Sequence, residues 1–268
     1  MIHSSKNILN HIKELPPVVE LRKKKYEKKF ASNQYLNLFK GIYPNFEMAS
    51  AAAKNYQTKG YNNKKSAQMY QDMCHKIFPE DYPTLYWINR LIPQISSLID
   101  FGGHVGIKRY AFDSYLEKIN QVKWSVYDLP KVIDEAKNLK TQLDPQNEIN
   151  LNFLNDLENQ NTDLFMALGS FQYIPKEVPE VLDELSSLPQ YLLISIPVTK
   201  KKTFLTLNHI GTTVCPYIIR NEDEFLKGIK EKGYSLKDSW SAPNKICEIP
   251  FHEEYSVYGY SGFVFEKS

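Results

Sequence analysis

The sequence predicts a three-layer α/β sandwich with a mostly parallel sheet, preceded by an N-terminal helical cap. Short apolar runs alternate with helical patterns from Ser97 onward, and a glycine-rich turn follows the first run. The N-terminal third instead carries apolar residues at helical spacing. We therefore divide the chain into a helical extension, residues 1–95, and an α/β domain, residues 96–268.

The composition is that of a globular protein and limits the classes of function. Apolar residues make up 42% and charged residues 24% of the 268 residues, as in ordinary soluble domains. The 33 basic and 31 acidic side chains leave a net charge of +2, which argues against a dedicated nucleic-acid binder. The sequence has no run of the ~20 apolar residues that a membrane span needs.

The cysteines and the N-terminus predict a cytoplasmic protein. Cys74, Cys215 and Cys247 are an odd number, lie far apart and form no CxxC pair. The first ten residues contain no apolar run long enough for export. We also expect no metal centre, because the histidines lack metal-ligand spacing. The histidines considered are His75, His209 and His252.

The helical extension begins with a basic segment. Residues 1–30 have apolar residues at helical spacing, interrupted by Pro16 and Pro17. Their positive run favours a solvated helix face, with contact to an anionic surface or a phosphate as the alternative. The run consists of Arg22, Lys23, Lys24, Lys25, Lys28 and Lys29. Further helices are expected over Phe46–Lys54, after Pro44 and Asn45, and over Lys64–Phe78 and Tyr82–Ile92, with a loop at Gly60 and Tyr61.

Strands and helices then alternate, as in parallel sheets with right-handed crossovers. The expected strands are 98–101, 124–127, 149–153, 164–168 and 191–196, and the expected helices are 105–119, 131–139 and 176–185. The tail differs. Asn221 caps a helix, with Glu224 at the capping-box position, and that helix ends near Gly233. Residues 234–240 and 255–265 are expected to form two strands that pair antiparallel.

The segment I-D-F-G-G-H-V-G, residues 99–106, lies between a strand and a helix, where doubly wound folds bind nucleotide-like ligands. It lacks the Gly-Lys-Ser/Thr of a P-loop and fails both registers of G-x-G-x-x-G. Asp100, Gly102 and Gly106 fit the acid-x-Gly-x-Gly-x-Gly spacing of S-adenosylmethionine (SAM) loops, with His104 replacing the middle glycine and Gly103 beside it. A carboxylate there favours the cations of SAM, and glycines admit close backbone approach. A plain glycine turn with Asp100 as a helix cap is the alternative.

Polar residues follow the next strands at the same edge of the predicted sheet. Asp128 ends the second strand, where an acid can bind ribose hydroxyls; it can also cap the helix at Pro130. Asn155 and Asp156 follow the third strand and could reach an adenine edge, although such residues are also common in turns. Gly169 and Ser170 follow the fourth strand. The predicted cofactor-binding residues are Tyr61, Asp100, Gly102, Gly103, His104, Gly106, Asp128, Asn155, Asp156, Gly169 and Ser170.

These features resemble the class I SAM-dependent methyltransferases, and more closely a small group of methyltransferases from bacterial surface-polysaccharide (O-antigen) gene regions. The matching segments are G-I-Y-P-N-F-E-M-A from Gly41, G-Y-N from Gly60, D-F-G-G-H-V-G from Asp100 and A-L-G-S-F-Q-Y-I from Ala167. The resemblance covers nearly the whole chain from Phe39. It implies a seven-stranded sheet with an antiparallel last strand and SAM, converted to S-adenosylhomocysteine (SAH), over the first strands. Tyr61 would then reach the methionine end.

The sequence thus predicts methyl transfer to an oxygen or nitrogen of a small polar acceptor, which the resemblance makes sugar-related. The loops at 169–173 and 197–211 are expected to form the acceptor site, with Gln172 and Asn208 as polar groups. His209 is the candidate general base, with Tyr173 as an alternative base or orienting group; His209 could instead only satisfy loop hydrogen bonds. The rival function is a non-catalytic SAM-fold scaffold or ligand sensor, in which His104 intrudes into the cofactor space.

Overall fold

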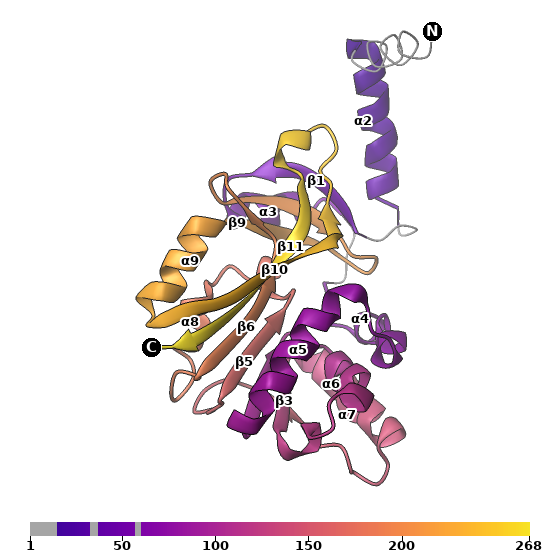
Figure 1. Cartoon of the computed structure of the whole chain (residues 1–268). Coiled ribbons are helices and arrows are strands. Elements are labelled where there is room, and N and C mark those ends of the chain that lie inside the picture. Colours follow the sequence, from indigo (N-terminus) through magenta and orange to yellow (C-terminus); the bar gives the residue numbers. More distant parts are fainter. Residues whose placement is uncertain (1–14, 33–36, 57–59) are drawn as a thin grey trace, which may run out of the picture.

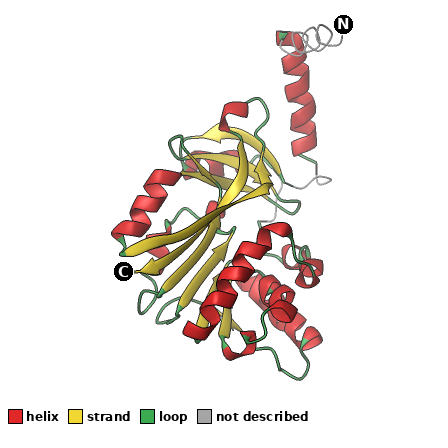
Figure 2. Cartoon of the chain, viewed as in Figure 1, coloured by secondary structure: helices red, strands yellow, loops and turns green. Residues whose placement is uncertain are grey.

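The computed structural model describes residues 15–32, 37–56 and 60–268 and contains a seven-stranded central sheet (Figures 1 and 2). The strand order is β10-β11-β6-β5-β2-β3-β4. All pairs from β6 to β4 are parallel, whereas β11 is antiparallel to both β6 and β10. The predicted mostly parallel sheet with an antiparallel last strand is confirmed. Its strands are β2 (Ser97–Phe101), β3 (Lys123–Tyr127), β4 (Leu151–Leu154), β5 (Leu164–Leu168), β6 (Tyr191–Ile196), β10 (Tyr234–Cys247) and β11 (Val257–Lys267).

Helices cover both faces of this sheet and complete the three layers. Alternate residues of each strand face opposite sides. Leu98 and Leu193 pack with α5, α6 and α7, whereas Ile99 and Ile194 pack with α8 and α9. The helices are α5 (Tyr82–Leu91), α6 (Ile107–Phe112), α7 (Pro130–Leu143), α8 (Val178–Leu182) and α9 (Glu222–Glu231). The predicted cap of α9 is confirmed, because Asn221 Oδ1 accepts the Glu224 N–H at 2.8 Å.

A second, four-stranded sheet lies above the central one in Figure 1 and was not expected. Its order is β1-β8-β9-β7. Residues 197–211 were expected to be loop, but Phe204–His209 form a strand that is buried on both faces and pairs with β9 as a hairpin. β1 pairs antiparallel with β8, so the N-terminal extension is not purely helical. The strands are β1 (Leu38–Tyr43), β7 (Val198–Thr199), β8 (Phe204–His209) and β9 (Val214–Asn221).

The N-terminal helices differ in length from the prediction. α2 (Pro16–Phe30) projects from the body of the molecule (Figure 1), and its two prolines occupy the first turn, where the missing N–H is tolerated. The predicted helix 1–30 is therefore present from residue 16; residues 1–14 lie outside the described part. α3 (Phe46–Ala53) matches its prediction.

Three predicted helices are shorter than expected, and one of them is α8 (Val178–Leu182), which was expected over 176–185. The helix expected over 64–78 is α4 (Lys64–Gln68) followed by the 3₁₀ turn η1 (Gln71–His75). α6 starts only at Ile107, because the glycine loop continues through Gly106 at φ +88°, and it ends at Phe112. None of the helices in the described ranges is long and apolar enough to cross a membrane. The other 3₁₀ turns are η2 (Pro79–Asp81), η3 (Ile92–Gln94), η4 (Asp113–Tyr115), η5 (Ile119–Gln121), η6 (Phe171–Tyr173) and η7 (Glu253–Tyr255).

Candidate cofactor and acceptor site

The loop after β2 has an unusual backbone that explains its glycines. Gly102, His104 and Gly106 all have positive φ, at +72°, 58° and +88°, a region that strains most side chains. The Gly102 N–H donates to the Tyr127 carbonyl at 2.7 Å, which ties the loop to the end of β3. A Cβ on Gly102 would lie 2.3 Å from the Cβ of Ser170. Glycine is therefore required for the loops after β2 and β5 to approach each other.

His104, which replaces the middle glycine, joins this loop to the N-terminal cap. Its backbone N–H donates to Asp128 Oδ2 at 2.9 Å. Its Nε2 lies 3.1 Å from the Ser66 carbonyl, so Nε2 carries the proton and donates. The rings of Tyr61 and Tyr70 flank the imidazole, with centroids 6.2 and 5.5 Å away. His104 therefore faces the cap, and the cap rests on the glycine loop through it.

The protonation state of His104 follows from its burial. The side chain is 6% exposed, and burial lowers its pKa to about 4. The imidazole is therefore neutral at pH 7, with Nδ1 as the unprotonated nitrogen. Nδ1 is buried and has no hydrogen-bond partner among the described residues. A buried acceptor of this kind is costly unless a ligand supplies a donor.

Two carboxyl groups lie beneath and beside the loop, as predicted for Asp100 and Asp128. Burial raises the pKa of Asp100 to about 7, although Trp124 Nε1 donates to its Oδ2 at 3.2 Å and acts in the opposite direction. Burial also raises the pKa of Asp128, opposed by backbone N–H donors from Leu129 and His104. Asp128 remains part-exposed. Each of its oxygens has one donor and retains a lone pair for a ligand hydroxyl.

The other predicted cofactor residues lie at the same sheet edge with different contacts. Gly169 has φ +93°, and Ser170 Oγ donates to the Phe101 carbonyl at 2.8 Å. Asn155 and Asp156 follow β4, two strands from β2, and are exposed. The structure thus brings the loops after β2, β3 and β5 into direct contact, with Tyr61 above them. Among the described residues, no hydrogen bond or ion pair joins Asn155 or Asp156 to this group.

Five partly or fully buried tyrosines lie close enough to interact electrostatically with one another, and three of them, Tyr70, Tyr217 and Tyr260, were not predicted. We call this set the tyrosine cluster: Tyr61, Tyr70, Tyr173, Tyr217 and Tyr260. Burial raises the pKa of every member. A negative charge on one phenolate would also disfavour ionisation of its neighbours. The phenols are therefore neutral hydrogen-bonding groups. The total of 18 tyrosines was the only sequence signal for the cluster, because its members come from distant segments.

Polar side chains connect the tyrosine cluster to the two sheets. The Tyr173 hydroxyl donates to Asn208 Oδ1 at 2.9 Å, and Asn208 lies on β8. Gln172 Nε2 lies 3.3 Å from the Tyr260 hydroxyl, and Gln172 Oε1 is buried without a partner among the described residues. Gln172 and Asn208, both expected as polar groups here, therefore lie against the tyrosine cluster.

The structure does not bring His209 to this cluster. His209 is the neighbour of Asn208 on β8, so the two side chains lie on opposite faces of the second sheet. Asn208 contacts Tyr173, whereas the His209 ring packs edge-on against Phe30, with centroids 5.8 Å apart. Its Nδ1 accepts the Gly211 N–H at 3.4 Å. This placement favours the alternative, in which His209 satisfies loop hydrogen bonds, over a general base.

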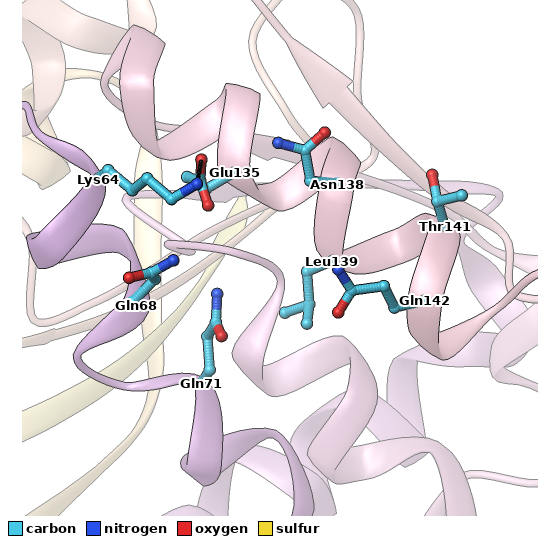
Figure 3. A pocket seen from close by; sticks show the side chains of 8 residues that line it. All are labelled: Lys64, Gln68, Gln71, Glu135, Asn138, Leu139, Thr141 and Gln142. Atoms are coloured by element: carbon cyan, nitrogen blue, oxygen red, sulfur yellow. Dashed lines mark ion pairs between the residues drawn. The ribbon is translucent and has the colours of Figure 1, made fainter.

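A separate polar recess of about 440 Å³ lies between α4 and α7 (Figure 3). Lys64 and Glu135 face each other across it, with Nζ and Oε1 3.3 Å apart. Most of the other lining side chains are amides, including Gln68, Gln71 and Asn138. None of the predicted cofactor or catalytic residues lines this recess.

Comparison with known proteins informs the fold. No protein-family model and no curated protein matches the sequence. A crystal structure of OxaC in complex with SAH and oxaline is 16% identical, with a TM-score of 0.52, over 78% of this chain and 52% of that one. A 1,6-didemethyltoxoflavin-N1-methyltransferase from Burkholderia thailandensis is 14% identical, with a TM-score of 0.48, over 75% and 81% of the two chains. The similarity to OxaC shows that this chain has the same Rossmann-like α/β fold.

Proposed function

We propose that this protein is a cytoplasmic SAM-dependent methyltransferase that methylates an oxygen or nitrogen of a small, polar, sugar-related acceptor. The observation that carries the proposal is the junction of the loops after β2 and β3, where the His104 N–H binds Asp128. Open α/β sheets bind ligands at this edge. The sugar-related acceptor and the link to surface-polysaccharide biosynthesis rest on the sequence resemblance.

The described residues fit SAM. Gly102 and Gly103 keep accessible backbone beside the part-exposed carboxylate of Asp128, which suits ribose hydroxyls. His104 Nδ1 is a buried acceptor that lacks a donor, and the methionine ammonium would supply one. Asp156 is exposed at the end of β4 and is free to turn toward an adenine amino group.

SAM supplies an activated methyl group on a cationic sulfonium, and the chain must position the acceptor in line with it. The tyrosine cluster excludes water from that region. Tyr173 is not suited to act as a base, because burial holds its pKa well above its usual range. Its hydroxyl donates to Asn208 and can accept a hydrogen bond from the acceptor. We therefore assign Tyr173 an orienting role, with proximity and desolvation providing most of the rate.

Calorimetry with SAM and SAH tests the cofactor assignment directly. We expect the wild type to bind both, and Asp128→Ala to bind about 10–100-fold more weakly, because hydrogen bonds to a charged group contribute about 1.5–3 kcal/mol. Asp134→Ala, an exposed acid on α7, is the matched control. Binding of NAD in place of both ligands, or unchanged affinity in Asp128→Ala, would contradict the assignment.

The alternative is a non-catalytic SAM-fold scaffold or sensor. The observation in its favour is that the His104 ring lies between the glycine loop and the cap, where a side chain can occupy cofactor space. The two functions differ in turnover. An assay of SAM-to-SAH conversion with sugar nucleotides and small hydroxylated or amino metabolites distinguishes them. SAM binding without turnover on any acceptor would favour the sensor.

A further inference from the structure

A basic recess lies far from the glycine loop, between the second half of α2 and the loop at Pro250 and Phe251. Its volume is about 500 Å³. Four cationic side chains of α2 line it, together with Tyr26 and Phe251, and no carboxylate is among the described residues that line it. The cations are Arg22, Lys25, Lys28 and Lys29.

The charge of this region differs from that of the whole protein. α2 carries six cations and two acids, a net charge of +4, whereas the complete chain has a net charge of +2. The rest of the protein is therefore slightly acidic. Such a concentration of one sign on a projecting element produces a local positive potential.

Neither of the two acids of α2, Glu20 and Glu27, lines the recess. Glu27 forms an ion pair with Lys40 and accepts a hydrogen bond from the Tyr56 hydroxyl at 2.9 Å, so its carboxylate is directed at β1 and at the turn after α3. Glu248, which follows β10, acts on Tyr26 electrostatically but does not line the recess either. Like charges three and four positions apart, as at Arg22, Lys25 and Lys29, destabilise a helix, and a bound anion would relieve that repulsion.

Phe251 gives the recess a defined shape. It has φ 68°, a conformation that strains a bulky residue and that is found mainly where function or packing requires it. Its ring lies 5.5 Å from the Arg22 guanidinium carbon and 5.9 Å from Lys23 Nζ, and it packs edge-on against Tyr26. These contacts hold the guanidinium in place without removing its charge.

We infer that this recess binds a phosphate-bearing anion, with two adjacent phosphate groups as the preferred ligand. The planar guanidinium matches a phosphate in a bidentate geometry, and three lysines add point charges around it. Four cations suit an anion of higher charge than a single phosphate monoester. The phosphates could belong to a soluble diphosphate or to a lipid headgroup, because both present the same chemistry.

The test uses the full chain with inorganic pyrophosphate. In parallel it uses vesicles of phosphatidylcholine that contain phosphatidylinositol 4,5-bisphosphate, a headgroup with two adjacent phosphates, or vesicles of phosphatidylcholine alone. The wild type is expected to bind pyrophosphate or the anionic vesicles at about 20 mM salt, and more weakly at about 150 mM, because salt screens exposed charges. Binding to pyrophosphate assigns a soluble source, and binding to anionic vesicles alone assigns a headgroup. Binding to neither overturns the inference.

Two variants locate the binding. Lys25→Glu/Lys28→Glu is expected to weaken it at least tenfold, whereas the charge-matched control Lys118→Glu/Lys137→Glu, on exposed positions elsewhere, is expected to leave it unchanged. Lys25→Gln/Lys28→Gln gives a milder version if charge reversal perturbs folding, which circular dichroism checks. Equal weakening in the α2 and control variants would show a general charge effect and overturn the site.

Discussion

At the scale of single residues, His104 and Asp100 are buried ionisable groups with opposite pKa shifts. Burial raises the pKa of Asp100 to about 7 and lowers that of His104 to about 4. Folding therefore favours the neutral form of both. The Asp100 contribution is fully present below the carboxyl pKa of an unfolded chain, about 4, and is lost as the pH rises through about 7. The His104 contribution is present above about 6.5 and is lost as the pH falls towards 4.

We expect Asp100→Asn to change the pH dependence of stability in a defined direction. Between pH 5 and pH 8 the wild type loses about 2–3 kcal/mol of free energy of unfolding at this site, which is part of the ~4 kcal/mol that a shift of three pKa units represents, whereas the amide does not titrate. Urea unfolding across this range measures the difference. Asp134→Asn on the exposed face of α7 controls for charge removal. Parallel curves for wild type and Asp100→Asn would contradict the shift.

Variants of Tyr173 and His209 test which of the two residues orients the acceptor and which only stabilises the fold. Once an acceptor is identified, Tyr173→Phe is expected to lower kcat about tenfold. The variant loses the hydrogen bond to Asn208 and the hydrogen bond to the acceptor. His209→Ala is expected to lower stability while kcat stays within about twofold, because its ring packs on Phe30 away from the cluster. Steady-state kinetics and thermal unfolding of both variants decide. A large kcat loss only in His209→Ala would restore it as the base.

At the scale of elements, α9 has a cap that both the sequence and the structure define. Asn221 Oδ1 accepts the Glu224 N–H, and its amide donates to the Lys201 carbonyl at 2.9 Å. Asn221→Ala is expected to lower the free energy of unfolding by about 1–2 kcal/mol. Denaturant unfolding measures this, with Asn244→Ala as an exposed-asparagine control. A loss no larger than the control's would show that the cap is not needed.

At the scale of the whole molecule, the two sheets make the N-terminal extension part of the fold. β1 pairs with β8, and the Asn208 amide donates to the Leu38 carbonyl at 3.3 Å. A fragment of residues 96–268 would leave β8 as an unpaired edge and would lose α5 from the main core. We expect it to aggregate or to unfold without a cooperative transition in calorimetry. A cooperative transition within about 5 °C of that of the full chain would show that the fragment is an independent domain.

The sequence by itself determined the features that depend on neighbouring residues. Short apolar runs located the central strands and helical spacing located most helices, because a strand buried on both faces is apolar throughout and a helix buried on one face repeats with its turn. The glycines at 102 and 106 marked a loop with room for close backbone approach, and the structure gives both the positive φ that strains other residues. Asp128 and the Asn221 cap were likewise predictable, because their positions relative to a strand end or a helix start define them.

Tertiary structure alone decided the features that join distant segments. The pairing of β1 with β8 links residues about 170 positions apart, and nothing local to Leu38–Tyr43 specifies that partner. The tyrosine cluster comes from the cap, η6, β9 and β11, so its members share no sequence pattern. The orientation of His209 was decided by strand register, because a shift of one residue on β8 exchanges its face with that of Asn208. Local patterns specify backbone conformation, whereas side-chain neighbours depend on which faces meet when the whole chain folds.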